Sequence, residues 1–137
     1  MEYVQKNSVQ FINNTVLEKI MKIYYAHSKK IYNTRKEEAE YAKIRKQFPD
    51  ARIVCPNRDL GELGSMESYL RVVGTCDAVV CSEYKRLIGK GALTEVLFAI
   101  SSGKPAYNLS KKFKNVKSFE LVNQGRDWVG YAKLIHQ

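Results

Sequence analysis

The chain reads Gly-Lys-Gly-Ala-Leu-Thr-Glu-Val-Leu-Phe-Ala-Ile-Ser-Ser-Gly-Lys-Pro at residues 89–105. This stretch predicts a helix over 92–102 that follows a glycine-rich turn, ends at Gly103 and precedes a strand at 105–109. One carboxylate, Glu95, lies in the first turns of this otherwise apolar helix. The positive end of the helix dipole favours an ionised carboxylate, and glycines allow a ligand to approach the backbone. The stretch therefore predicts an anionic group beside a phosphorylated or sugar-bearing ligand.

Strand and helix signals alternate along the rest of the chain. Strands are predicted at 23–26, 52–55, 78–82 and 105–109, with a fifth at 118–122. Helices are predicted after the capping box at Thr34 and after Ser65, and a final helix at 126–135, with a polar loop at 56–64 and a basic turn at 111–117. This alternation predicts an α/β fold of the Rossmann-like or flavodoxin-like kind. Its doubly wound, mainly parallel sheet would have four to five strands and helices on both faces.

Length and composition indicate a single domain. The 137 residues are 45% hydrophobic and 27% charged, as in ordinary soluble proteins. We assign residues 21–137 to one α/β domain and residues 1–20 to an N-terminal arm or extension. Its apolar residues give a partial helical stripe. The arm could be an addition to the domain, a dimerisation element, or sequence upstream of a second start, and the sequence leaves these open.

Cysteine use and hydropathy indicate where the protein acts. Cys55, Cys76 and Cys81 have no metal-binding or redox spacing, so we expect buried thiols in a reducing cytosol. No apolar run reaches the roughly 20 residues that span a bilayer, so we expect a cytoplasmic protein without membrane contact. Histidines, cysteines and carboxylates are not grouped at ligand spacing, so we expect no metal and no organic cofactor.

The net charge of +9 favours anionic partners, which include nucleic acid, nucleotides and phosphorylated metabolites. The basic residues are spread over every segment, so a solvated basic surface is the simplest interpretation.

Parallel α/β sheets bind ligands at the carboxyl ends of their strands, and this rule gathers distant residues at one place. The candidate binding residues in the loops after the first three strands are His27, Ser28, Lys29, Asn57, Lys85, Lys90 and Gly91. Hydroxyl and ammonium groups among them suit a phosphate, and His27 could act as a general acid or base. Asp77, which opens the third strand, is a further candidate binding residue, although a cap or salt bridge is its simpler role.

The face of the helix that carries Glu95 has two interpretations. Thr94, Ser101 and Ser102 share that side and could form a solvent-facing stripe. Phe98 falls in the same arc, which indicates cover by a ligand, another subunit or the N-terminal arm. Cover by another subunit would make the protein a homodimer or a higher homo-oligomer.

Three segments together resemble the nucleoside 2-deoxyribosyltransferase superfamily, which includes the 2′-deoxynucleoside 5′-phosphate N-hydrolases. They are Ile-Tyr-Tyr-Ala-His-Ser at 23–28, Cys-Asp-Ala-Val-Val at 76–80, and residues 91–105, and the resemblance covers 21 to about 109. It implies that Glu95 attacks the anomeric carbon and that Tyr24 and Ser28 contact the sugar and phosphate. It also implies catalysis without a cofactor and assembly as an oligomer.

The chain departs from the family's pattern at three places. His27 replaces a glycine before the serine, and Gly89 stands where the family has a serine or aspartate that holds the 5′ group. The family's second acid aligns near Tyr69. Glu67 is the nearby carboxylate, and its place in the first turn of a helix also suits the helix dipole without any other role.

The sequence thus predicts cleavage or base exchange at the N-glycosidic bond of a nucleoside or nucleoside 5′-phosphate, with catalytic residues Glu95, Tyr24 and Glu67. One alternative is a non-catalytic module of the same fold that senses or sequesters a nucleotide. A weaker alternative is a basic nucleic-acid-binding protein, because the chain has no aromatic-basic recognition motif.

Overall fold

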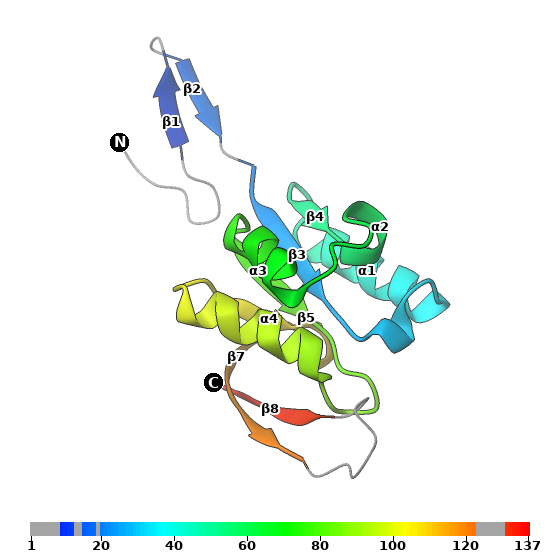
Figure 1. Cartoon of the computed structure of the whole chain (residues 1–137). Coiled ribbons are helices and arrows are strands. Elements are labelled where there is room, and N and C mark those ends of the chain that lie inside the picture. Colours follow the sequence, from blue (N-terminus) through cyan, green and yellow to red (C-terminus); the bar gives the residue numbers. More distant parts are fainter. Residues whose placement is uncertain (1–8, 13–14, 19, 123–130) are drawn as a thin grey trace.

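The computed structural model describes residues 9–12, 15–18, 20–122 and 131–137, with side chains from residue 20 onward. Its elements are labelled in Figure 1. The strands are β1 (Val9–Ile12), β2 (Thr15–Glu18), β3 (Lys22–Ala26), β4 (Arg52–Val54), β5 (Ala78–Cys81), β6 (Ala106–Asn108), β7 (Lys114–Leu121) and β8 (Ala132–His136). The helices are α1 (Arg35–Gln47), α2 (Pro56–Asp59), α3 (Met66–Gly74) and α4 (Lys90–Ser101), and the 3-10 helices are η1 (Lys29–Ile31) and η2 (Leu109–Lys111).

A six-stranded sheet with the order β4-β3-β5-β6-β7-β8 forms the centre of the fold. Strand β3 pairs in parallel with β4 and β5, and β5 pairs in parallel with β6. Strands β7 and β8 extend the sheet in the antiparallel direction. The predicted α/β class is confirmed, but the sheet is mixed and has more strands than the four to five expected.

The parallel strands determine where ligand-binding loops gather. From β3 the chain crosses to β4 on one side, and from β5 it continues to β6 on the other. The strand order therefore changes direction between β3 and β5, and the loops leaving β3, β4 and β5 lie at the same edge of the sheet.

Apolar residues of β3 face both sides of the sheet, because successive side chains of a strand alternate. Tyr25 belongs to the core that α1 covers with Ile44. Tyr24 belongs to the core that α3 and α4 cover with Val73 and Val96. Helices α3 and α4 lie side by side over this second face (Figure 1). The prediction of helices on both faces is therefore confirmed.

The helix starts are those that the sequence predicts. The Thr34 hydroxyl accepts a hydrogen bond from the Glu37 N–H at the start of α1, and the Ser65 hydroxyl accepts one from the Ser68 N–H at the start of α3. Helix α4 is followed by Gly103, whose φ of 79° is in the left-handed region.

Among the described residues, no helix is long and apolar enough to cross a bilayer.

The C-terminal prediction is wrong where the structure describes it. The helix expected at 126–135 is strand β8 over Ala132–His136, and residues 126–130 lie outside the described part. Ala132 and Leu134 are buried while Lys133 is exposed, which is the two-residue period of a half-covered strand. The turn expected at 111–117 is η2 followed by β7, which begins four residues before the predicted fifth strand.

The N-terminal arm contains a hairpin and not the partial helix that its apolar residues suggest. Strands β1 and β2 pair antiparallel, with Ile12 opposite Thr15. The hairpin projects away from the six-stranded sheet in Figure 1. Residues 1–8, 13–14 and 19 lie outside the described part, so the structure contradicts the helical prediction only for residues 9–12 and 15–18.

Candidate functional site

A cleft of about 820 Å³ lies at the edge of the sheet where the parallel strands end. Its walls come from the segment after β3, the loop between β4 and α3, and the first turns of α4. The residues that line it include His27, Ser28, Lys29, Lys30, Tyr32, Asn57, Glu62, Tyr69, Gly89, Lys90, Gly91 and Glu95. Residues far apart in the sequence therefore meet where the strand order predicts a site.

Glu95 lies at the inner wall of this cleft, with only 7% of its surface exposed. Its Oε2 accepts a hydrogen bond of 2.5 Å from the Tyr24 hydroxyl. Tyr24 is fully buried on β3, on the sheet face that α4 covers. Burial and the neighbouring Glu95 raise the pKa of Tyr24, so the phenol stays neutral and donates. The central strand thus fixes the position of the carboxyl group.

Burial raises the pKa of Glu95 to about 7, and the hydrogen bond from Tyr24 partly opposes this change. The sequence predicts a carboxylate that the helix dipole holds ionised, whereas the raised pKa leaves this carboxyl only about half ionised at pH 7. Helix α4 begins at Lys90, which places Glu95 in its second turn. The dipole acts mainly within the first turn, so the loss of hydration dominates.

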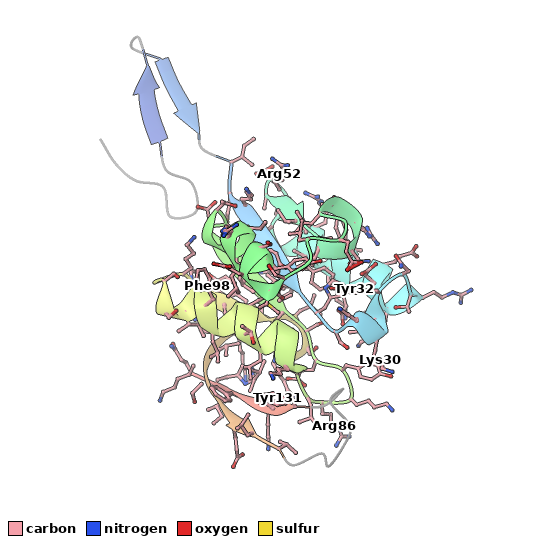
Figure 2. The ribbon with its side chains drawn as sticks, viewed as in Figure 1. Lys30, Tyr32, Arg52, Arg86, Phe98 and Tyr131 are labelled. Carbon is pink, nitrogen blue, oxygen red and sulfur yellow. The ribbon has the colours of Figure 1, made fainter. Side chains whose placement is uncertain are left out.

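Ser28, Lys29 and Lys30 form the basic rim of the cleft after β3. The Ser28 hydroxyl caps η1 by accepting a hydrogen bond from the Lys30 N–H at 3.1 Å. Figure 2 labels Lys30 and Tyr32 on this segment. Lys90 and Gly91 face the same cleft from the start of α4. Hydroxyl, ammonium and backbone N–H groups of this kind suit an anionic group such as a phosphate.

Four of the predicted site residues do not line the cleft. Tyr24 is fully buried and reaches the site only through its hydrogen bond to Glu95, and the other three lie elsewhere. Glu67 has a side chain that is 78% exposed and lies 3.6 Å from Arg71 of the same helix. Asp77 accepts a hydrogen bond from the Lys22 N–H at the amino end of β3, the opposite end of the strand. Lys85 has its ammonium 5.5 Å from the centre of the Tyr84 ring.

A tight turn explains the position of Lys85. Tyr84 and Leu87 pair through both backbone hydrogen bonds, and the two residues between them have positive φ values of 52° and 68°. The turn continues into a bridge between Ile88 and Ala132 of β8, which draws it toward the antiparallel strands. Figure 2 shows Arg86 at the outer end of this turn.

Phe98 also has an explanation within the chain. Its ring packs against the core under α3 and α4, and it lies close to Gly74, where an added Cβ would be 3.8 Å from the ring. The neighbouring helix α3 therefore covers part of this aromatic residue, which remains partly exposed.

Sequence reasoning missed Tyr32, Glu62 and Tyr69 as cleft residues. Glu62 is, with Glu95, one of two carboxylates among the described lining residues. It lies between Gly61 and Gly64, whose φ values of 64° and 88° are in the left-handed region that favours glycine. These glycines were the available signal, because a loop with two left-handed positions has a defined shape.

Comparisons with known proteins bear on the fold alone. The scan against protein-family models finds no match, and the search of curated proteins also finds none. Among solved structures, the chain is similar to a conserved protein from Enterococcus faecalis V583, with a TM-score of 0.53 and 18% identity. The similarity covers 65% of this chain and 62% of that protein, so the chain spans less than two thirds of its length.

Proposed function

We propose that the cleft binds a nucleoside or nucleoside 5′-phosphate and that Glu95 cleaves its N-glycosidic bond. The observation that carries this proposal is the buried Glu95 carboxyl, held by Tyr24 at the wall of a cleft with a basic rim. A nucleophilic carboxylate must be shielded from water and fixed in direction, and this pair meets both needs. The resemblance of residues 21–109 to nucleoside 2-deoxyribosyltransferases points to the same chemistry.

The reaction would proceed by double displacement, as in retaining glycosidases. An ionised Glu95 attacks C1′ of the sugar, and the bond from C1′ to the base nitrogen breaks as the base gains a proton. Water or a second base then attacks C1′ and frees the carboxylate. Glu62 is the carboxyl on the cleft wall available for proton transfer, whereas the exposed Glu67 pairs with Arg71.

The rim of the cleft suggests how a nucleotide would be held. Ser28 and Lys29 after β3, with Lys90 at the start of α4, would bind the 5′ phosphate. Tyr32 and Tyr69, which also line the cleft, would supply aromatic surface for the base. The sugar would then lie between these groups, beside Glu95.

The test is release of free base from a panel of nucleosides and 5′-nucleotides, followed by chromatography. We expect Glu95→Gln to lower the rate by about 1,000-fold or more, because the nucleophile is lost. Glu67→Gln is the matched control, since it removes an exposed carboxylate from an adjacent helix, and it should leave the rate unchanged. Full activity of Glu95→Gln would overturn the proposal.

The second candidate function is nucleotide binding without cleavage. It is favoured by the pKa of Glu95 near 7, since about half of the carboxyl groups are then neutral at pH 7 and cannot attack. This candidate predicts binding of nucleotides with no release of base at any pH. It also predicts that Glu95→Ala retains the affinity for the nucleotide.

A further inference from the structure

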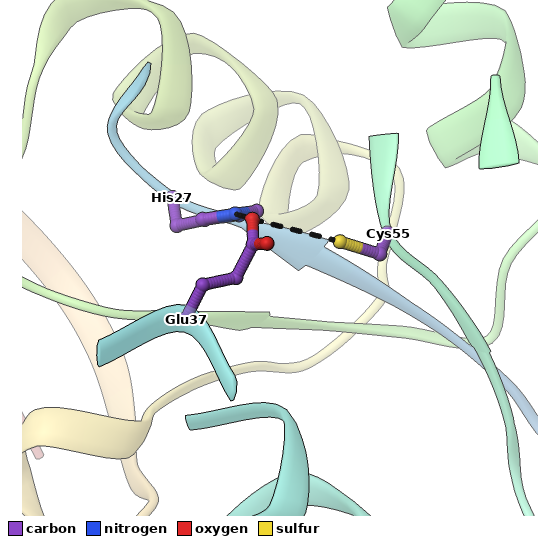
Figure 3. A group of neighbouring side chains, drawn as sticks. All are labelled: His27, Glu37 and Cys55. Atoms are coloured by element: carbon purple, nitrogen blue, oxygen red, sulfur yellow. Dashed lines mark hydrogen bonds and ion pairs between the residues drawn. The ribbon is translucent and has the colours of Figure 1, made fainter. Parts of the chain in front are cut away.

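Figure 3 shows three side chains that are potential metal ligands and lie close together. One of them, His27, also lines the cleft. His27 follows β3, Cys55 follows β4, and Glu37 lies in the first turn of α1. The His27 Nε2 lies 2.7 Å from Glu37 Oε2, and the Cys55 Sγ lies 3.9 Å from the same oxygen. All three ligand atoms lie within 4.8 Å of one another, and all three residues are buried. We call this set the His-Glu-Cys cluster.

The hydrogen bonds of His27 determine which of its nitrogens faces the cluster. Its Nδ1 lies 3.1 Å from the Tyr25 carbonyl oxygen, which can only accept, so Nδ1 carries a proton. The lone pair of a neutral imidazole is then on Nε2 and points at Glu37 Oε2. Two acceptors 2.7 Å apart need a cation between them, either a proton or a metal ion.

Other groups hold the outer sides of these ligands. The second oxygen of Glu37, Oε1, accepts a hydrogen bond of 3.1 Å from the Asn33 N–H and lies 3.6 Å from Arg58 Nε. The Tyr25 ring stacks on His27 with 3.7 Å between the ring centres. These contacts orient the ligands and leave Oε2, Nε2 and Sγ facing one another. Metal ligands in proteins are commonly oriented by such outer partners.

We propose that the His-Glu-Cys cluster binds a divalent transition metal ion, with zinc as the ion that its donors suit best. Thiolate, imidazole and carboxylate ligands together are typical of zinc and unsuited to magnesium or calcium. In a tetrahedral site with bonds of about 2.0–2.3 Å, ligand atoms lie about 3.2–3.8 Å apart. The Cys55–Glu37 distance is already close to this range, and the His27–Glu37 distance needs to widen by about 0.5 Å.

Charge and access are consistent with such an ion. Burial raises the pKa of the Cys55 thiol to about 11, so the sulfur becomes an anion only as the metal displaces its proton. The Glu37 carboxylate and the Cys55 thiolate would then carry two negative charges, which match a dication beside the single positive charge of Arg58. Asn57 has its Oδ1 3.3 Å from the Cys55 sulfur and also lines the cleft. The fourth position would therefore lie toward the cleft, where water or a ligand atom can reach it. Binding would release the Cys55 thiol proton and the proton shared by His27 and Glu37.

The first test titrates the metal-free full chain, without an affinity tag, with Co²⁺ as the spectroscopic probe. We expect a thiolate-to-cobalt absorption band and tetrahedral visible bands that saturate at one equivalent and disappear when Zn²⁺ is added. The unmutated protein should also release about two protons for each Zn²⁺ bound at pH 7. Absence of the thiolate band, or saturation without proton release, would overturn the proposal and leave a structural ion pair.

The second test compares two buried cysteines. Cys55→Ser should weaken Co²⁺ binding by more than about 100-fold and abolish the thiolate band, because changes in outer partners alone cost about 10–100-fold. Cys76→Ser is the matched control, since each thiol is buried and donates to a nearby protein oxygen. A band that survives Cys55→Ser would refute the site. Neither readout requires substrate, so failure here would leave the glycosidic proposal untouched.

Discussion

Replacing Glu95 with glutamine should stabilise the protein at alkaline pH and have little effect at acid pH. The buried carboxyl of Glu95 has a pKa of about 7, against 4.5 for the ordinary side chain. The unfolded chain therefore releases this proton near pH 4.5, while the folded protein keeps it until about pH 7. Between these values the folded state binds more protons, so Glu95 lowers stability as the pH rises.

The magnitude follows from the difference between the two pKa values. Each pH unit corresponds to about 1.4 kcal/mol, so the penalty at pH 8 and above is about 3 kcal/mol. Glutamine cannot ionise, and its amide oxygen can still accept the hydrogen bond from Tyr24. The free energy of unfolding of Glu95→Gln should thus exceed that of the unmutated protein by about 3 kcal/mol at pH 8, and the difference should vanish near pH 4.

Urea unfolding of both proteins at intervals from pH 4 to pH 9 measures this difference directly. Other titrating groups are common to the two proteins and cancel. The exposed Glu67→Gln serves as the control, and its difference should stay flat with pH. If the difference in unfolding free energy for Glu95→Gln also stayed constant with pH, the Glu95 carboxyl would be hydrated in the folded protein. The proposal of a shielded carboxyl at the cleft wall would then be refuted.

Three further results are expected. If Glu95 is the nucleophile, kcat/KM for base release should rise with pH through about 7 and then level off, whereas a decline above pH 7 would assign it the role of a general acid. Tyr24→Phe should raise the pKa of Glu95 above 7, because it removes the hydrogen bond that stabilises the ionised carboxylate. NMR titration of the carboxyl carbon measures this pKa, and an unchanged value would contradict the contact. Thr34→Ala should lower the free energy of urea unfolding by about 1 kcal/mol through loss of the α1 cap, and no change would show that the cap contributes nothing.

Local signals in the sequence were sufficient for the parallel half of the fold. Thr34 and Ser65 cap the helices that they predict, and the Glu95 helix ends before Gly103. Each of these signals involves groups a few residues apart, so the sequence carries them directly. Strand order predicts that Glu95 faces the cleft, whereas Tyr24 was singled out by the resemblance to nucleoside 2-deoxyribosyltransferases; the structure joins the two by a hydrogen bond.

The antiparallel strands and the N-terminal hairpin were harder to predict from the sequence. Ala132–His136 is too short to distinguish a strand from a helix by period, and its pairing with β7 depends on contacts distant in the sequence. The hairpin had a signal that was missed, because Asn13-Asn14 lies between two short apolar runs and asparagine pairs favour tight turns. In both cases a two-residue alternation was interpreted as part of a helix.

The His-Glu-Cys cluster shows why spacing alone misses some sites. Its members are 10 and 18 residues apart and come from three different elements, so no local motif contains them. The raised pKa of Glu95 was equally hidden, since it depends on how much of the side chain the fold covers.

Strand β3 holds two neighbouring phenols that bond to carboxyl groups on opposite sides of the sheet. Tyr24 donates to Glu95 of α4, and Tyr25 donates to Glu40 of α1 at 2.5 Å. Each helical layer is thus anchored to the same strand by its own hydrogen bond, and the two hydrogen bonds lie on opposite faces of the sheet. A change at the Glu95 carboxyl would act first on the α4 layer, while the Tyr25–Glu40 hydrogen bond on the other face would continue to hold α1.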